Sequence, residues 1–233
     1  MRLLASLSTA LFVIAIPLAI ISTDVRWLAL SPSFYENGQM KFGAMQTIGL
    51  RAEQVQASSR ALSSYFGSHN DLASELQKQG LPADFFNERE TNHLKDVKVL
   101  LIRVLRVQQI ALGYGIIFLL VALVLGPRNF LRRVSRGLLL GAGLTVVVLI
   151  VFGALSFADF SDLFLMFHLV SFTNDLWILD PRTDYLIRMF PSQFFFEAAL
   201  TLAAYALIES IGIALVGAGL SVVQRRFATQ RAD

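Results

Sequence analysis

The chain has 233 residues, of which 55% are hydrophobic and 16% charged, and its formal net charge is +3 at pH 7. Soluble domains are roughly 45–50% apolar, and a soluble domain of this size would still leave a large fraction of its residues in water, so the composition favours an integral membrane protein. The sequence contains no cysteine, which excludes disulfides, thiolate metal sites and a cysteine nucleophile.

Four apolar stretches are long enough to cross a membrane as helices, since a helical span needs about 20 residues. We expect an all-α polytopic fold in a single membrane domain over residues 1–233, with transmembrane helices at 3–21, 107–126, 137–157 and 196–222. Gly137 and Gly141 are spaced as the small-residue pair typical of a helix contact. Glu209 lies well inside the fourth stretch and is expected to face the other helices, because a charge facing lipid is costly.

The first stretch is interpreted as an uncleaved transmembrane helix. Arg2 before it is also compatible with the charged start of a secretory signal peptide. However, no small-x-small cleavage pattern follows Ile21, and the apolar run is long for a signal peptide. Cleavage would leave three spans and the same outward segments.

The distribution of arginine predicts the orientation, because short cytoplasmic loops are enriched in basic residues. The segment between the third and fourth spans carries five aspartates against two arginines. The cytoplasmic candidates instead carry arginine without acid between the second and third spans, and more arginine after the fourth: Arg128, Arg132, Arg133, Arg136, Arg225, Arg226 and Arg231. We therefore expect both termini in the cytoplasm, with residues 22–106 and 158–195 forming the extracytoplasmic region.

The first outward segment contains three predicted helices, after a start at residues 22–51 whose structure the pattern does not predict. Ala52–Phe66 has the apolar spacing of an amphipathic helix. Asp71 is expected to cap a short helix that runs through Gln79 and ends at Gly80. The third helix, Asn87–Val107, continues without a breaking residue into the second span.

The third helix carries Glu90, His93 and Asp96, whose spacing of three residues places them on one side of it. Mixed charges on a helix face are commonly only solvated, and the basic neighbours fit that interpretation. The alternative is a histidine oriented by a carboxylate, an arrangement suited to acid–base catalysis. The spacing alone leaves both interpretations open.

The second outward segment has a denser set of aromatic and polar residues around His168. Aromatic residues gather at the membrane boundary, so we expect this segment to lie along the outer leaflet, with little water near the histidine. A single histidine in an apolar run is more often structural than catalytic. Two outward histidines, each accompanied by acids, favour a functional site, whereas His69 lies in a polar loop and is interpreted as surface.

The two histidine segments resemble those of the bacterial lipoprotein intramolecular transacylase family, which are four-span integral membrane proteins. The match extends to span order and loop placement over essentially the whole chain, although residues 22–89 carry no matching signature. It is most specific in the patterns Glu90-x-x-His93-x-x-Asp96-Val97, Phe167-His168, Asn174-Asp175-x-Trp177 and Asp180-Pro181-x-x-Asp184.

The resemblance implies an enzyme that moves the sn-2 acyl chain of a lipoprotein diacylglyceryl-cysteine onto the same cysteine's α-amino group, giving a lyso-form lipoprotein. It implies a place in the bacterial cytoplasmic membrane, with the active site on the outer face. Diacylated lipoproteins are the implied substrate and membrane lipid the implied surroundings, with no cofactor, metal or nucleic acid. The implied catalytic residues are His93 and His168, supported by Glu90, Asp96, Asn174, Asp175, Trp177, Asp180 and Asp184.

Within this interpretation His93 is the favoured base, because Glu90 and Asp96 can orient it, and His168 or Asn174 is left to stabilise the oxyanion. The two histidines can also exchange roles. A second enzymatic interpretation is a metal-dependent membrane hydrolase with both histidines and two acids as ligands, although the spacing matches no metal motif. A non-enzymatic interpretation is an envelope assembly or sensing protein whose outward segments bind a partner.

Overall fold

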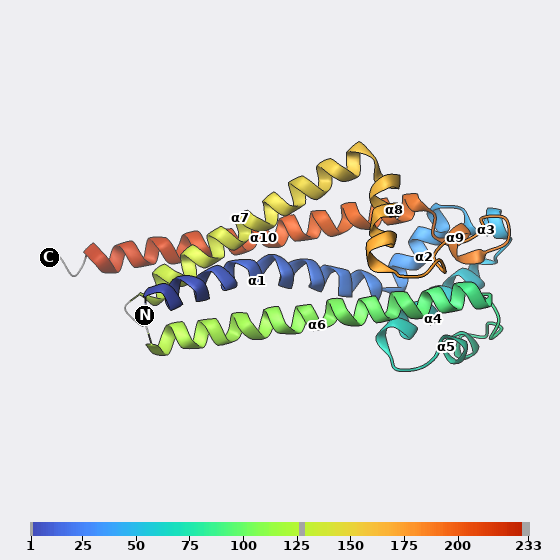
Figure 1. The fold of residues 1–233 in the computed structure, drawn as a ribbon, viewed down its shortest axis with the longest axis horizontal. Helices are drawn as coiled ribbons and strands as arrows, with labels where there is room; N and C mark the ends of the chain where they lie inside the picture. Colours follow the sequence, from blue (N-terminus) through green and yellow to red (C-terminus); the bar gives the residue numbers. More distant parts are fainter. Residues whose placement is uncertain (1, 126–128, 230–233) are drawn as a thin grey trace. The chain divides into compact units, whose positions relative to one another are not determined.

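The computed structural model describes residues 2–125 and 129–229, so Arg128 and Arg231 lie outside the described residues. The described part is helical and contains no strand (Figure 1). Its helices are α1 (Arg2–Ala29), α2 (Pro32–Lys41), α3 (Ala44–Ile48), α4 (Ala52–Gly67), α5 (Leu72–Lys78), α6 (Glu88–Leu125), α7 (Phe130–Ala158), α8 (Phe160–Ser171), α9 (Tyr185–Met189) and α10 (Ser192–Thr229).

Among the described residues, four helices are long and apolar enough to cross a membrane, and they contain the stretches Leu4–Ala29, Glu88–Val124, Phe130–Ala158 and Ser192–Arg226. The expected all-α fold with four candidate spans is confirmed. The 37 residues of the second stretch extend over about 55 Å as a helix, whereas the hydrocarbon core is about 30 Å thick. Its charged start, residues 88–106, therefore protrudes from the apolar part that begins at Val107. The narrower span limits read from hydropathy stay predictions, as does the single membrane domain.

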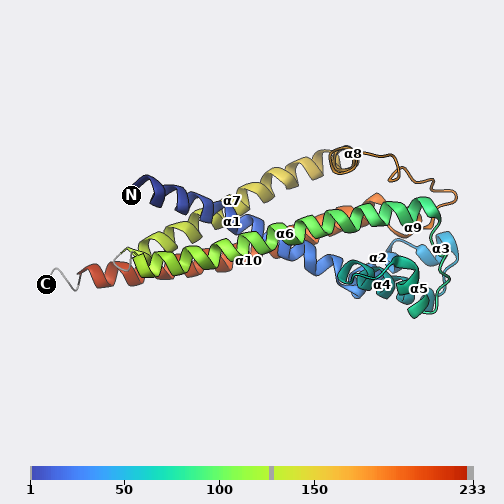
Figure 2. The ribbon, with the colours of Figure 1, turned by 60° about the horizontal axis from the view of Figure 1, so that its bottom comes forward.

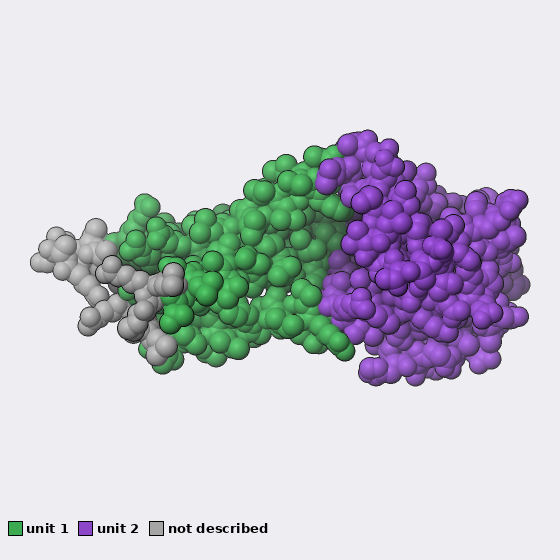
Figure 3. All heavy atoms as spheres, in the orientation of Figure 1, with its two compact units in different colours: residues 1–24, 105–154, 202–233 green, residues 25–104, 155–201 purple. Residues whose placement is uncertain are grey.

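The chain divides into two compact units (Figure 3). Unit 1 consists of residues 1–24, 105–154 and 202–233, and unit 2 of residues 25–104 and 155–201. Unit 1 holds most of the apolar length of the four long helices. Unit 2 holds the shorter helices and every candidate site residue.

The core of unit 1 is formed where α1 packs against its neighbours. Phe12 of α1 stacks on Phe118 of α6, with ring centroids 4.2 Å apart. A Cβ atom added at Gly137 would lie 2.5 Å from the Phe12 ring, and one added at Gly141 would overlap Ile16. The helix contact expected from the spacing of these two glycines is confirmed, since only glycine lets α7 approach α1 this closely.

The position of Glu209 differs from the predicted one. Its side chain is exposed in unit 1, so the prediction that it faces the other helices is wrong. The inward stripe of α10 instead runs through Ala206 and Ser210, which are 0% and 1% exposed and lie four residues apart on one helix face. Glu209 lies at the edge of that stripe, within electrostatic range of Asp24 on α1.

In unit 2, helices α2, α4 and α5 lie together (Figure 2). Helix α4 buries Val55, Leu62 and Phe66 as its apolar spacing predicted. The side chain of Asp71 accepts a hydrogen bond from the Ser74 amide at 2.8 Å, which confirms its role as the cap of α5.

Helices α2 and α3 fall in residues 22–51, where no structure was predicted. The side chain of Ser31 caps α2, and Pro32 is its first residue. A serine followed by proline is a recognised helix start, so this signal was present in the sequence.

Candidate active site

Helix α6 begins with a capping box that fixes its first turn in unit 2. The Asn87 Oδ1 atom accepts a hydrogen bond from the Glu90 amide at 3.0 Å, and Glu90 Oε2 accepts one from the Asn87 amide at 2.8 Å. Each side chain thereby satisfies an amide that a helix start leaves without a partner. Asn87 was not among the predicted site residues, although an Asn-x-x-Glu spacing before a helix indicates such a cap.

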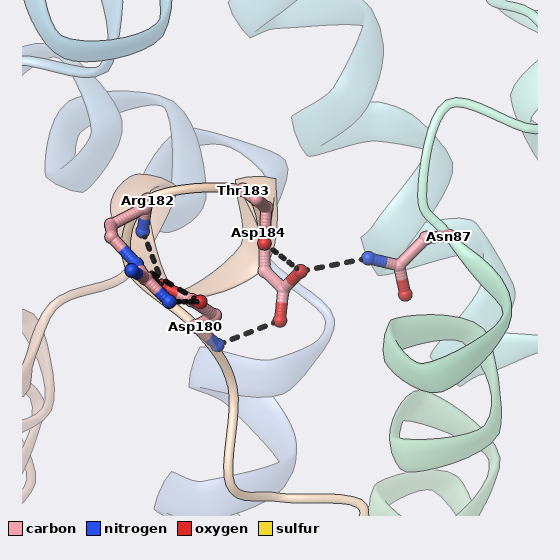
Figure 4. A network of polar contacts seen from close by, with 5 residues as sticks. All are labelled: Asn87, Asp180, Arg182, Thr183 and Asp184. Carbon is pink, nitrogen blue, oxygen red and sulfur yellow. Dashed lines mark hydrogen bonds and ion pairs between the residues drawn. The ribbon is translucent and has the colours of Figure 1, made fainter.

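The same two residues tie α6 to the turn before α9. Glu90 Oε1 accepts a hydrogen bond from the Leu186 amide at 2.6 Å. The Asn87 side-chain amide donates to Asp184 Oδ1 at 2.9 Å, while the Asp180 amide donates to Asp184 Oδ2 at 2.8 Å (Figure 4). Glu90 is 2% exposed, and burial raises the pKa of its carboxyl group. The network joins two segments that are distant in the sequence.

Asp180 forms an exposed ion pair with Arg182 at 2.6 Å (Figure 4). Hydrogen bonds from the Arg182 side chain lower the pKa of Asp180 to about 2. An exposed pair of this kind adds little stability. Asp180 and Asp184 therefore shape the turn at residues 180–186 and do not reach either histidine through any described hydrogen bond.

A second set of bonds holds the extended segment after α8 beside α6. The Asn174 side-chain amide donates to Asp96 Oδ2 at 2.9 Å. Arg89 donates to the Ile178 carbonyl at 3.0 Å and also to the Asp175 carbonyl. Asp175 thus contributes its backbone here, and its carboxylate is exposed.

His93 lies one turn after Glu90 on α6 and is 7% exposed. Its Nδ1 atom is buried and has no hydrogen-bond partner among the described residues. The ring meets Phe172 edge-on at 5.2 Å between centroids. Burial, followed by the nearby His168, lowers the pKa of His93 to about 4, so the ring is neutral at pH 7.

His168 lies on α8 among aromatic rings. Its Nδ1 is 2.7 Å from the Phe164 carbonyl oxygen. A carbonyl only accepts, so we infer that Nδ1 carries the proton and that Nε2 of the neutral ring is free to accept one. The imidazole packs against Trp177 at 5.0 Å between centroids, which gives that predicted residue a direct place in the site. Burial lowers the pKa of His168.

The structure brings the two histidines together, with ring centroids 6.1 Å apart and planes inclined by 30°. Neither the Glu90 carboxylate nor the Asp96 carboxylate is hydrogen-bonded to His93 Nδ1, which has no partner among the described residues. The Glu90 carboxylate instead accepts a hydrogen bond from the Leu186 amide, and the Asp96 carboxylate accepts one from the Asn174 side chain. Among the described residues, no group of three or more His, Asp or Glu side chains is arranged to hold a metal ion.

Fold and site together describe a helical membrane protein with two neutral, partly desolvated histidines suited to proton transfer. The family model described as lipoprotein intramolecular transacylase Lit matches residues 10–195. The match covers most of the 233 residues, and the chain belongs to this family. It is therefore a membrane-integral intramolecular transacylase that acts on lipoproteins.

Solved structures of a family member have the same fold. The chain resembles the lipoprotein intramolecular transacylase Lit from Bacillus cereus with a TM-score of 0.82 and 21% identity, over 97% of this chain and 100% of that one. It resembles the same Bacillus cereus enzyme with a histidine-to-arginine mutation at a TM-score of 0.75 and 21% identity, over 97% and 95% of the two chains. At this identity the likeness establishes the fold alone. No curated protein matches the chain.

Proposed function

We propose that the enzyme moves the sn-2 acyl chain of a diacylglyceryl-cysteine onto the α-amino group of the same cysteine, with His93 and His168 as the catalytic pair. The observation that carries the assignment is the distance of 6.1 Å between the two imidazole rings. They come from different helices of unit 2, and burial lowers the pKa of both. An ester placed between them is within reach of a neutral ring on either side.

The proposed reaction needs no atoms beyond those of its substrate. The amine nitrogen attacks the ester carbonyl, the new amide C–N bond forms, and the bond between the carbonyl carbon and the glycerol oxygen breaks. One proton moves from the nitrogen to that oxygen, which becomes a hydroxyl group. Because amine and ester belong to one molecule, alignment supplies several kcal/mol of the barrier reduction, and a histidine is suited to carry the proton.

We assign the base to His168 and oxyanion stabilisation to His93. The bond from His168 Nδ1 to the Phe164 carbonyl orients the ring and leaves Nε2 as the proton acceptor, as an orienting group does in a catalytic triad. Burial lowers the pKa of His93 to about 4, and an N–H of its neutral ring is suited to donate to the developing oxyanion. This exchanges the roles favoured from the sequence, because the carboxylates expected to orient His93 are bonded elsewhere.

The remaining predicted residues position the two histidines without contacting the reacting atoms. Asn174 donates to Asp96 and accepts from the Leu176 amide at 3.0 Å, so it positions the segment that carries Trp177. Glu90 and Asp184 hold the first turn of α6 against the turn at residues 180–186. We propose that these residues fix the distance between the histidines.

Intramolecular transfer predicts a specific labelling result. When the purified enzyme acts on a mixture of two lipoproteins, one with isotopically labelled acyl chains and one unlabelled, every new amide should carry its own protein's label. Mass spectrometry of the N-terminal peptides measures this. A labelled amide on the unlabelled lipoprotein, or an acyl group released from the enzyme by hydroxylamine, would contradict the proposal.

The pH dependence should follow the substrate amine and not the enzyme. A histidine base acts only when neutral. Burial lowers the pKa of His93 to about 4 and lowers the pKa of His168 below its ordinary value, so both rings take up a proton at a lower pH than a free imidazole does. The α-amino group, with a pKa of about 8 in model compounds, must lose its proton to attack. We expect log kcat/KM to fall with a slope of one from pH 7 to 6, measured by product formation. A slope of two beginning near pH 6.5 would indicate an unperturbed histidine.

We propose further that both termini lie in the cytoplasm and that unit 2 faces outward. The described arginines at residues 132, 133 and 136 support this orientation. A reporter that works only outside the cytoplasm should be active when fused after Gly67 and inactive when fused after residue 233. The reverse pattern would place the site on the cytoplasmic face.

A further inference from the structure

An open pocket of about 520 Å³ lies in unit 2 around the first turn of α6. Three segments form its wall: the turn between α3 and α4, residues 82–90, and the turn that leads into α9. Gln54, Asp84, Glu90 and Tyr185 contribute polar groups to it. The volume falls within the range of ligand-binding sites, and the described catalytic chemistry does not use the pocket.

The pocket is connected to the catalytic pair through α6. Glu90 lines it, and His93 follows three residues later, about 4.5 Å further along the helix axis. Glu90 precedes His93 along α6, so the pocket lies toward the N-terminal end of this helix from His93. A lipoprotein whose cysteine is held at His93 can extend its polypeptide toward that end of α6, where the pocket lies.

We infer that this pocket binds the first residues of the lipoprotein polypeptide that follow the acylated cysteine, in an extended conformation. The inference rests on the proposed function, because it takes His93 as the point where the cysteine is held. It adds a peptide subsite to the lipid chemistry.

The lining fits a peptide backbone better than a lipid. Gly49 has a φ of 70°, and a Cβ atom added there would meet nothing within 4 Å, so its bare backbone is open to close approach. The Gln54 side chain uses its oxygen on the Arg51 amide at 3.0 Å, which leaves its NH₂ group to donate to a peptide carbonyl. The rings of Phe85 and Tyr185 meet edge-on at 5.6 Å and form a firm side wall.

The charge of the pocket selects among peptides. Asp84 is exposed and acidic, and none of the eleven lining residues is lysine or arginine. A phosphate head group or an acidic peptide would meet like charge there, whereas neutral or basic residues would not. The pocket therefore favours lipoproteins whose first residues after the cysteine are not acidic.

Substrates of different peptide length test the inference with the full-length enzyme. The first substrate is diacylglyceryl-cysteine amide, the second carries four serines after the cysteine, and the third replaces the first of these serines with aspartate. Four extended residues reach about 13 Å. We expect kcat/KM for the tetraserine substrate to exceed that for the short one by about tenfold, the effect of a few hydrogen bonds, and the aspartate substrate to lose most of that gain.

Two tryptophan variants provide the matched comparison. Asp84→Trp obstructs the pocket and should reduce the ratio between tetraserine and short substrates to about one, with turnover of the short substrate unchanged. Ala83→Trp adds the same group to the adjacent exposed residue, which does not line the pocket, and should keep the wild-type ratio. Asp84→Asn leaves the shape intact and should selectively improve the aspartate substrate.

Equal rates for short and long substrates in the wild type, or an unchanged ratio in Asp84→Trp, would overturn the inference. If Asp84→Trp fails to fold, the Asp84→Asn comparison decides: no gain for the aspartate substrate would overturn it. The proposed function is tested separately. It predicts that the histidine variants lose turnover of the short substrate, whether or not peptide length affects the wild-type rate.

Discussion

Replacing His168 with asparagine should lower kcat by about 10² to 10⁴, the usual contribution of a general base. Asparagine preserves polarity and approximate size but has no group that titrates near neutral pH. In the proposed mechanism the wild-type ring offers Nε2 to the substrate, because its Nδ1 is bonded to the Phe164 carbonyl. Turnover of a purified diacylated lipoprotein, followed by mass spectrometry, measures the loss.

His93→Gln should lower kcat by about 10² to 10³, the usual cost of losing one oxyanion donor. Because both histidines act on one transition state in the proposed mechanism, the double variant should lose far less than the product of the two single losses. His69→Asn is the control, since the third histidine is exposed in the loop after α4 and distant from this chemistry in sequence. Full activity in either His93 or His168 variant, with His69→Asn also active, would remove that residue from the mechanism.

Glu90→Ala should be the most destabilising single change in unit 2 among the predicted site residues. It removes the acceptor of the Leu186 amide at 2.6 Å and that of the Asn87 amide at 2.8 Å. The bond of the Leu186 amide is buried, and a buried donor left unsatisfied costs about 1–3 kcal/mol. For a chain of this size, each kcal/mol lowers Tm by about 2–4 °C, so we expect a fall of several degrees in thermal unfolding.

The neighbouring substitution Glu88→Ala is the matched control, because Glu88 is exposed in the same first turn of α6 and should change stability by less than about 0.5 kcal/mol. Hydrogen exchange gives a local readout that global unfolding lacks. The Leu186 amide should exchange faster in Glu90→Ala and at the wild-type rate in Glu88→Ala. Unchanged protection of that amide would show that the contact between α6 and the turn before α9 does not depend on Glu90.

Hydropathy and helical periodicity were sufficient to predict the elements whose signal is local. The four long apolar helices follow from composition over about 20 residues, and α4 and α5 follow from apolar spacing and the Asp71 cap. Both histidines were identified from their acidic and aromatic neighbours and from the family resemblance. These features depend on residues close together in the chain.

The partners of the site residues were not predictable in the same way. Asp96 is bonded to Asn174, and Glu90 to the Leu186 amide, across separations of 78 and 96 residues. No periodicity relates such positions, so the carboxylates were assigned to the histidine on their own helix. The prediction for Glu209 was wrong for a related reason. A glutamate facing lipid is costly, which suggested that it faces inward, but the buried stripe through Ala206 and Ser210 decides which side of α10 faces inward.

Helix α8 carries His168, one of the two proposed catalytic residues, and the protein covers this helix on one side only. Phe164 of α8 stacks on Phe195 at 4.7 Å, and Phe160 meets Phe196 at 5.2 Å. None of the described residues of α8 is buried, and Met166, Leu169 and Val170 are 56%, 55% and 83% exposed. Acyl chains or detergent must cover that apolar side. We therefore expect the lipid or detergent around α8 to influence the position of His168, so that the measured rate of acyl transfer depends on which one is present.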